Sequence, residues 1–423
     1  MEPVRILFIE HSIFPSYGGS KRVLYNILSH LDRDRFEPYV LFHSTGPYVD
    51  QIAALGIPVS APEELRLAFG AGTGWGFDWP GGELLFGRGR TSDGEVQRSS
   101  LRLLARDLRS EVQYNLRERA RARDLGRFVP DGVDLIHFNA PMQERYEWAH
   151  VAMQRGVPFL THEHGVWRRP PSAFRRVAHD AAAVICLTDE RASQVREFCA
   201  GRVQTEVVPN GVDVEMQQPR RSRAEVRAEF GLDDSIPFLV TASHILEWKG
   251  QALGVEAARL LRDRGVDFQW FFCGSEIDPD FALRLRQQID AAGLLAQVRL
   301  LDQRGDVPDL FGAADLAVHT SIRPEPFGMA VIEAMSVGAP VVGPAEGAIS
   351  SIVRDGVDGR LYTARDASGL ADAIQGLLAD PRARRRLGEG GRRRVVESFS
   401  LTRQVDLLSA IYERVAREVR TTR

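Results

Sequence analysis

The chain has 423 residues, of which 44% are apolar and 26% are charged, and its formal net charge is −3. This composition excludes a disordered chain, a collagen-like repeat and a disulfide-rich scaffold. A length of about 150 residues per domain predicts two to three domains. Because neutralising several phosphates needs a concentrated excess of Lys and Arg, the charge balance argues against a nucleic-acid partner and favours a small-molecule one.

The cysteines and the N-terminal residues indicate in which cellular compartment the protein is expected. Cys186, Cys199 and Cys273 follow no disulfide or metal-ligand spacing, so we expect a reducing, cytoplasmic environment. Residues 1–10 lack the basic region and apolar stretch of a leader, and no window approaches 18 uninterrupted apolar residues. We therefore expect no membrane-spanning segment. Only two of the 54 basic residues are lysines, Lys21 and Lys249, which makes both candidates for a site.

Short apolar runs alternate with stretches of helical periodicity along the chain. The runs predict strands at 4–9, 39–42, 135–138, 159–161, 183–187 and 206–208, and after a break at 238–241, 268–273, 298–301, 316–319 and 340–342. Helices are predicted between most of them, for example at 22–31 and 173–179. Near-continuous apolar strands that alternate with helices are typical of parallel sheets covered on both faces, so we predict two doubly wound α/β domains.

The break between the two series is the turn signal Pro-Asn-Gly-Val-Asp at 209–213, followed by a polar connector at 217–222. We therefore predict an N-terminal domain over 1–213 and a C-terminal domain over 214–400. Residues 401–421 read as an amphipathic helix, and we expect the C-terminal helix 401–423 to pack back on the N-terminal domain.

Two segments of the first domain stand outside the alternation. Residues 69–100 are rich in Gly and include Trp75 and Trp79, so they read as a long loop, either a functional lid or a plain insertion. Residues 101–128 form an Arg-rich helical pattern with apolar residues at helical spacing. We expect this helix to pack on the core, with a membrane-surface patch as the less favoured alternative, because acidic residues dilute its basic side.

Candidate ligand-binding loops follow the strands, since ligands bind at the carboxyl ends of the strands of open α/β sheets. After the first strand come Gly18 and Gly19, which let the backbone approach a ligand. After the first strand of the second domain, Lys249 lies at a predicted helix start, where its charge would attract phosphate. The dinucleotide and P-loop fingerprints are absent from the first of these loops.

The stretch Ser-Ile-Arg-Pro-Glu-Pro-Phe-Gly-Met-Ala-Val-Ile-Glu at 321–333 places two carboxylates eight positions apart. Glu325 lies in a loop after a strand, and Glu333 lies on a helix that starts near Gly328. The early amides of this helix offer an anion site, and Glu333 offers acceptors for a pair of hydroxyls beside it. This arrangement suits a ligand with a sugar, a pyrophosphate and a ribose.

This stretch resembles the E-x7-E signature of the retaining glycosyltransferases of family 4. The Pro-Asn-Gly-Val-Asp turn, Gly338 with the strand at 340–342, and the Asp-Gly turn at 355–359 resemble further motifs of that family. The resemblance implies a GT-B fold, with two Rossmann-like domains facing a central cleft. It implies that the domain over 1–213 lies on the acceptor side and that the domain over 214–400 binds the nucleotide sugar. It also implies transfer of a sugar from a nucleotide diphosphate sugar to a hydroxyl acceptor, with the anomeric configuration retained, and no catalytic metal or cofactor.

Carried over by position, the resemblance implies that Glu333 holds the donor ribose and that Glu325 contacts the transferred sugar. Lys249 would hold the diphosphate. The other positions that the resemblance places at the donor are Phe327, Gly328 and Met329 through their backbone, Gly19 in the Gly-rich loop, and His244, which stands where the family usually has Arg. His244 is a weaker, pH-dependent substitute, so donor choice or diphosphate affinity is expected to differ.

Residues 161–165, Thr-His-Glu-His-Gly, resemble the family's active-site histidine segment. His164 is the expected catalytic histidine, and His162 is the alternative. Asp278 and Asp280 mimic the Asp-x-Asp of metal-dependent transferases, but we interpret them as loop residues.

Two other functions stay open, a non-hydrolysing sugar-nucleotide 2-epimerase and a non-catalytic sugar-nucleotide sensor. The donor base and sugar are undetermined, and the acceptor is a glycan, a lipid-linked sugar or a natural product.

Overall fold

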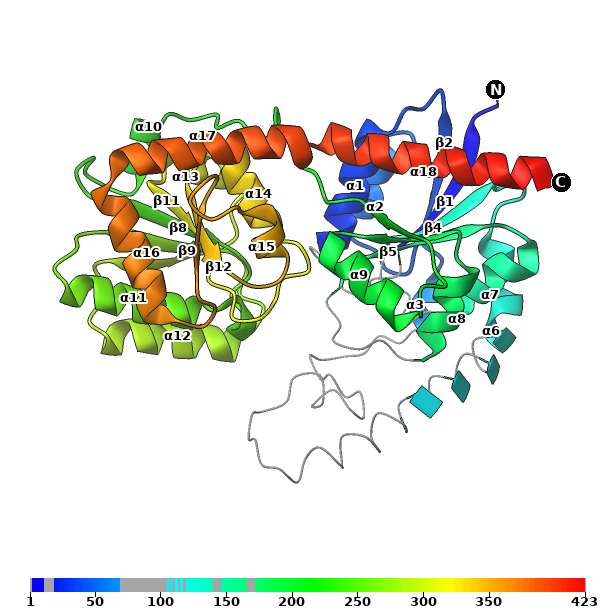
Figure 1. The fold of residues 1–423 in the computed structure, drawn as a ribbon, viewed down its shortest axis with the longest axis horizontal. Coiled ribbons are helices and arrows are strands. Elements are labelled where there is room, and N and C mark those ends of the chain that lie inside the picture. The colour runs from blue at the N-terminus through cyan, green and yellow to red at the C-terminus, as the bar shows by residue number, and fades with distance from the viewer. Residues whose placement is uncertain are drawn as a thin grey trace. The chain divides into compact units, whose positions relative to one another are not determined.

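The computed structural model describes residues 2–10, 19–68, 119–139, 146–165 and 172–422, with seven helical residues between 105 and 116. The chain divides into two compact units, residues 1–208 with 407–423 (unit 1) and residues 209–406 (unit 2). Each unit is a parallel β-sheet with helices on its faces (Figure 1). Gly18 and the Gly- and Trp-rich segment 69–100 lie outside the described residues.

Unit 1 contains a seven-stranded parallel sheet in the order β3-β2-β1-β4-β5-β6-β7. Its strands are β1 Val4–Glu10, β2 Phe36–Phe42, β3 Val59–Ser60, β4 Leu135–Phe138, β5 Phe159–Glu163, β6 Ala183–Cys186 and β7 Thr205–Val207. The central strands β4, β5 and β6 are buried at every residue. Accordingly β6 is apolar throughout and β4 is apolar except for one histidine, whereas β5 ends in Thr161, His162 and Glu163.

The helices of unit 1 connect these strands and cover the sheet. They are α1 Gly19–His30, α2 Pro47–Ala54, α3 Glu63–Ala68, α6 Arg119–Leu125, the 3-10 turn η2 Gly126–Phe128, α7 Tyr146–Arg155, α8 Ala173–Asp180 and α9 Asp189–Phe198. The helix α9 begins where the Thr188 side chain accepts a hydrogen bond from the Arg191 amide, an ordinary N-cap.

The amphipathic pattern at 101–128 folds differently from the expectation. Its last part, α6, buries Ala122 and Leu125 in the core of unit 1. By contrast, Leu108, Val112 and Leu116 are 64%, 48% and 67% exposed. The expectation that this helix packs its apolar positions on the core is therefore wrong for these three residues.

The last helix, α18 Leu401–Thr422, starts in unit 2, and its residues from Leu407 onward group with unit 1. There it buries Leu408, Ile411, Tyr412 and Val415. The Tyr412 ring packs edge-on against Phe8 of β1 and Phe36 of β2, with ring centroids 6.1 and 5.7 Å away. The apolar spacing read from the sequence thus follows the buried side of the helix.

Unit 2 contains a six-stranded parallel sheet in the order β10-β9-β8-β11-β12-β13. Its strands are β8 Phe238–Ala242, β9 Gln269–Cys273, β10 Val298–Leu301, β11 Leu316–Val318, β12 Val341–Pro344 and β13 Arg360–Tyr362. Its helices are α10 Arg223–Glu229, the 3-10 turn η4 Glu247–Lys249, α11 Gln251–Asp263, α12 Pro279–Ala291, α13 Val307–Ala313, α14 Met329–Ser336, α15 Ala348–Ile352, α16 Ala367–Ala379 and α17 Pro381–Ser398.

Asp278, which we interpreted as a loop residue, is the N-cap of α12, and its side chain accepts a hydrogen bond from the Phe281 amide. Asp280 lies in the first turn of the same helix. The Asp-Pro-Asp sequence is therefore a helix start, where a capping carboxylate and Pro at the first helical position are both favourable.

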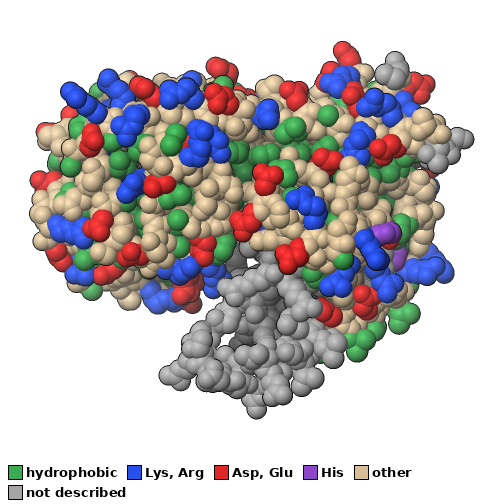
Figure 2. Space-filling view, viewed as in Figure 1, with side chains coloured by type: hydrophobic (Ala, Val, Ile, Leu, Met, Phe, Trp, Pro, Cys, Tyr) green, Lys and Arg blue, Asp and Glu red, His purple; other side chains and the backbone are tan. Residues whose placement is uncertain are grey.

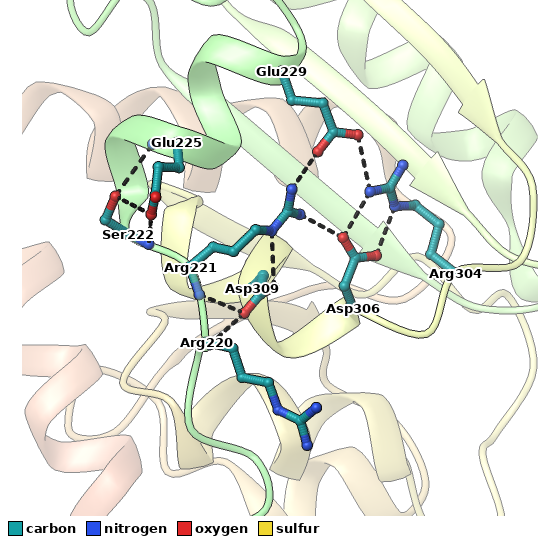
Figure 3. A network of polar contacts seen from close by, with 8 residues as sticks. All are labelled: Arg220, Arg221, Ser222, Glu225, Glu229, Arg304, Asp306 and Asp309. Atoms are coloured by element: carbon teal, nitrogen blue, oxygen red, sulfur yellow. Dashed lines mark hydrogen bonds and ion pairs between the residues drawn. The ribbon is translucent and has the colours of Figure 1, made fainter.

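A polar network fixes the beginning of unit 2 (Figure 3). The Arg221 guanidinium donates to Glu229, Asp306 and Asp309 at 2.6, 2.5 and 3.0 Å. Arg304 forms ion pairs with the same Glu229 and Asp306 at 3.0 and 2.7 Å. These contacts join the connector before α10 to the loop that precedes α13.

Candidate functional site

A cluster of polar residues of unit 2 lies at the carboxyl ends of β8 and β11. These two strands are neighbours, and the strand order reverses between them, since β9 and β10 lie on one side and β12 and β13 on the other. Such a switch point is where open α/β sheets bind ligands, because the loops that follow the two strands diverge. The loop after β8 carries His244 and Lys249, and the loop after β11 carries Glu325.

An ion pair between Lys249 and Glu325 connects the two loops. The Lys249 Nζ donates to Glu325 Oε1 at 2.7 Å. The same oxygen accepts a hydrogen bond from Ser321 Oγ at 2.5 Å, and His319 Nε2 lies 3.2 Å from it. The Glu325 side chain is only 5% exposed and that of Lys249 is 15% exposed, so water screens this cluster weakly.

The electrostatics of the cluster keep the Glu325 carboxyl ionised. Burial by itself raises its pKa, but the charge of Lys249, followed by the hydrogen bond and charge of His319, lowers it by more. The net effect places the pKa of Glu325 well below its usual range. Glu325 is therefore an ionised hydrogen-bond acceptor at neutral pH.

Backbone contacts hold the two loops in register. The Thr320 hydroxyl donates to the carbonyl of Lys249 at 2.8 Å, and the Ile322 amide donates to the carbonyl of Trp248 at 3.0 Å. Gly250 has φ +72°, and a Cβ there would lie 2.0 Å from the Thr320 carbonyl oxygen. Glycine is thus required at 250 for both conformation and space.

His244 lies earlier in the loop after β8. The side-chain amide of Gln251 donates to Ser243 Oγ at 3.0 Å and to the His244 carbonyl at 2.8 Å. Gly274, which follows β9, has φ +158°, and a Cβ there would lie 2.0 Å from the Ser243 carbonyl oxygen. The backbone of His244 is therefore fixed at the carboxyl edge of the sheet, where the sequence places it.

The helix α14 presents the second carboxylate. Its N-cap, Gly328, has φ +112°, and a Cβ there would lie 2.5 Å from Ile349 Cδ1, so this sharp entry also requires glycine. The Phe327 ring packs against Phe399 with centroids 5.9 Å apart, and Phe327 is buried. Glu333 lies in the second turn and is 7% exposed.

The start of α14 has the properties of an anion site. It has no side-chain cap hydrogen bond, and the amides of Val331 and Ile332 donate back to Gly328. The amides of Met329 and Ala330 have no carbonyl of the preceding turn to bind, as in any α-helix, and the helix dipole adds positive potential there.

In unit 1, the predicted catalytic histidine belongs to a stack of three. His164 follows β5, and its ring centroid lies 4.0 Å from that of His162, which lies 5.4 Å from that of His137 on β4. The Nδ1 atom of His137 lies 2.6 Å from the hydroxyl of Tyr412 on α18. Within the described part of the chain, neither ring nitrogen of His162 has a hydrogen-bond partner.

The stack is uncharged at neutral pH. Burial, and then repulsion from His164, lowers the pKa of His137 to about 3. Burial also lowers the pKa of His164 to about 3, and the pKa of His162 lies well below its usual value for the same reason and because of both neighbours. His164 can therefore donate or accept a hydrogen bond, but it does not supply a positive charge.

The other lysine, Lys21, is buried in the first turn of α1 and donates to Ser44 Oγ at 2.7 Å. Burial lowers its pKa, and the charge of Glu10 at the end of β1 opposes that effect. Asn139, which follows β4, donates to Glu10 Oε2 at 2.7 Å. This cluster lies at the β1/β4 switch point of unit 1, and Gly19 is the first residue of α1 beside it.

Sequence reasoning did not identify His319, Ser321, Gln251, His137 and Tyr412. The first two lie six and four positions before Glu325, so a search for polar residues in that loop would have found them. Tyr412 carries no such signal, because 275 positions separate it from His137.

Two α/β units of this kind, each with its polar residues at a switch point, define the GT-B class of glycosyltransferases. Models of two glycosyltransferase families match the chain, "Glycosyl transferases group 1" over residues 222–394 and "Glycosyltransferase Family 4" over residues 84–216. The chain belongs to glycosyltransferase family 4.

Curated relatives agree with this assignment, and a solved structure agrees with the fold. D-inositol 3-phosphate glycosyltransferase of Geodermatophilus obscurus is 33% identical over 338 residues, 70% of each chain. Alpha-maltose-1-phosphate synthase of Mycobacterium tuberculosis is 32% identical over 222 residues, and the match spans only 49% of this chain and 56% of that relative. The crystal structure of Anabaena Alr3699/HepE with UDP-glucose superposes with a TM-score of 0.71 at 21% identity, covering 99% of both chains. Among the described residues, no helix is both long and apolar enough to cross a bilayer.

Proposed function

We propose that this glycosyltransferase transfers a sugar from a nucleotide diphosphate sugar to a hydroxyl acceptor with retention of the anomeric configuration. The observation that carries the proposal is the Lys249–Glu325 pair at the β8/β11 switch point, next in sequence to the open amides at the start of α14. An ammonium group and helix amides suit a diphosphate, and ionised carboxylates suit sugar hydroxyls.

Each donor part has a residue of matching chemistry in unit 2. Lys249, His244 and the amides at the start of α14 hold the diphosphate. Glu325 accepts from the transferred sugar, and Glu333 accepts from the ribose. Anabaena HepE was crystallised with UDP-glucose, which supports a nucleotide sugar as the ligand of this fold. The identity of the base and of the sugar stays open, as does that of the acceptor.

The chemistry that these residues support is stabilisation of a leaving diphosphate. As the bond to the sugar breaks, negative charge grows on the diphosphate while the sugar becomes oxocarbenium-like, and preorganised donors lower the barrier. We propose that Lys249 and the α14 amides supply this stabilisation without a catalytic metal. The departing phosphate then accepts the acceptor's proton on the same face of the sugar, which retains the configuration.

His164 is the proposed catalytic residue of unit 1. Because it is neutral, its contribution is a hydrogen bond to the reacting sugar rather than a charge. Glu333→Ala should mainly weaken donor binding, whereas His164→Ala should mainly reduce kcat.

A thermal-shift screen against nucleotide diphosphate sugars identifies the donor, because a ligand that binds only the folded state raises the Tm. Proton NMR of the product made from that donor then gives the anomeric configuration. An inverted product, or negligible effects of both Glu333→Ala and His164→Ala, would contradict the proposal. An epimer of the donor formed without any acceptor would instead identify an epimerase.

A further inference from the structure

Three neighbouring loops of unit 2 meet at the side chain of Arg365. This residue lies in the loop after β13, and its two terminal nitrogens donate to the carboxylate of Glu346, in the loop after β12, at 2.7 and 2.9 Å. Its Nη1 atom also donates to the carbonyl of Ile322, in the loop after β11, at 3.0 Å. Because β11, β12 and β13 are adjacent in the sheet, one side chain joins three loops at the edge where Glu325 lies.

The backbone of Arg365 has a left-handed conformation. Its φ is +65°, and among the described residues only Ala200, at +53°, shares this feature without being glycine. The left-handed region is unfavourable for a residue with a Cβ, whereas glycine enters it freely. Arginine at this position therefore costs stability that glycine would not cost, which indicates a role for its side chain.

The ion pair by itself does not account for that cost. Figure 2 shows Lys or Arg side chains beside Asp or Glu side chains at several places on the surface of unit 2, so an exposed ion pair is ordinary here. The Arg365 side chain is 54% exposed and that of Glu346 is 26% exposed. Water screens such a pair, and exposed pairs contribute little to the free energy of unfolding. What Arg365 adds is its hydrogen bond to the backbone of the loop that carries Glu325.

The backbone of Ile322 is held from two sides. Its amide donates to the carbonyl of Trp248, and its carbonyl accepts from Arg365, both at 3.0 Å. Ile322 lies between Glu325 and Ser321, whose hydroxyl donates to Glu325 Oε1 at 2.5 Å. A shift of this backbone would therefore move the hydroxyl and the carboxylate relative to each other.

The loop after β12 packs against the same segment. Gly347 has φ +59°, and a Cβ there would lie 2.9 Å from Pro324 Cβ and 3.2 Å from the Glu325 amide nitrogen. Glu346 directly precedes this glycine. The ion pair with Arg365 therefore holds a backbone that is in close contact with the residue before Glu325.

We propose that Arg365 is a positioning residue for the carboxylate that binds the transferred sugar. Through the Ile322 carbonyl and through Glu346, it fixes the loop that directs Glu325 at that sugar. This inference rests on the proposed function, in which Glu325 accepts a hydrogen bond from the sugar. The hold on the loop, however, is a property of the chain without any ligand, so it can be measured separately.

The first measurement is hydrogen–deuterium exchange of the ligand-free full chain, resolved to single amides. The reporter is the Ile322 amide, which Trp248 protects. Arg365→Gly should make this amide exchange about tenfold faster, because the loop opens more often once its carbonyl is released. The amides of β8 and β11 should exchange at the wild-type rate. The Tm should not fall, because glycine relieves the backbone strain as the exposed ion pair is lost.

The second measurement separates the sugar from the diphosphate. Calorimetry gives the Kd of UDP-glucose, GDP-mannose and dTDP-glucose and of UDP, GDP and dTDP. For the nucleotide sugar that the wild type binds, Arg365→Gly should raise the Kd about tenfold, and for the matching diphosphate by no more than about twofold, since only the former has hydroxyls for Glu325. Failure of the wild type to bind any of the six contradicts the proposed function, and the exchange measurement still decides whether Arg365 holds the loop.

A second variant and a double variant test the route through Glu346. Glu346→Ala should shift both readouts in the same direction as Arg365→Gly. The double variant Arg365→Gly/Glu346→Ala should be no worse than Arg365→Gly, because the two residues act through one contact.

Two controls match the two features of Arg365. Arg259→Gln removes an exposed two-point ion pair with Glu256 on α11, at 2.6 and 3.2 Å. Ala200→Gly removes the other left-handed non-glycine conformation of the described chain. Both variants should match the wild type in the exchange of the Ile322 amide and in both Kd values.

Three results would overturn the proposal. They are an unchanged exchange rate of the Ile322 amide in Arg365→Gly, faster exchange throughout unit 2 with a lowered Tm, and equal weakening of the nucleotide sugar and its diphosphate. The second would show that Arg365 only stabilises the fold, and the third that it does not act through the sugar contact of Glu325.

Discussion

The buried Lys249–Glu325 pair allows a quantitative test by a double-mutant cycle. Glu325→Gln leaves the Lys249 ammonium, which is 15% exposed, without its anion. Removing one partner of such a pair costs about 3 kcal/mol of unfolding free energy, because the remaining charge is desolvated and uncompensated. Replacing both residues, as Lys249→Met/Glu325→Gln, should restore most of that loss. We therefore expect a coupling free energy of about 2 kcal/mol.

The assay is urea denaturation of the four proteins followed by tryptophan fluorescence, since the Trp248 ring lies 4.0 Å from Lys249 Nζ. The pH dependence gives a second readout. The folded pKa of Glu325 lies below the ordinary value of 4.5, so its contribution is complete above that value and decreases as the pH falls below it. Glu325→Gln removes this acid-dependent part. A double variant whose loss equals the sum of the two single losses would refute the reasoning.

Two further predictions concern the glycine at 250 and the histidine stack. Gly250→Ala should lower the unfolding free energy by about 2 kcal/mol or more and weaken binding of the donor found in the screen. The control is Gly231→Ala, at φ +66° with no described atom within 4 Å of the new Cβ, which should cost about 1 kcal/mol. Equal losses of unfolding free energy in the two variants would show that the Thr320 carbonyl moves aside for the new Cβ. The pKa of His137 is about 3 in the folded chain and 6.5 for an ordinary histidine, so unfolding takes up a proton at acidic pH. The unfolding free energy therefore falls as the pH drops below 6.5, by about 2 kcal/mol for this residue at pH 5. His137→Phe should make the fall in Tm between pH 7 and pH 5 less steep, and an unchanged slope would contradict the lowered pKa of His137.

Much of the fold followed from local pattern. The strands β4 and β10 have the bounds that the apolar runs predict, and most others agree within one to three residues at each end. The strands that the pattern missed are β3 and β13, which lie at sheet edges and have two and three residues. An edge strand is buried less fully and need not be a continuous apolar run, so periodicity does not reveal it.

The candidate site also has a part that the sequence identified and a part that only the structure showed. The sequence alone identified Lys249, Glu325 and the helix start at Gly328 as candidates. Each of them follows a predicted strand by only a few residues, and parallel strands bring their carboxyl ends to one edge of the sheet. It could not assign Ser321 and His319 to Glu325, nor Tyr412 to His137, because those contacts depend on side-chain directions in the folded units.

The sequence by itself determined the two α/β units, the family and the residues at the β8/β11 edge, since periodicity and motif spacing are properties of neighbouring positions. Only the tertiary structure decided that Leu108, Val112 and Leu116 face outward. An amphipathic pattern specifies that a helix has an apolar side, but it does not specify whether another part of the chain covers that side.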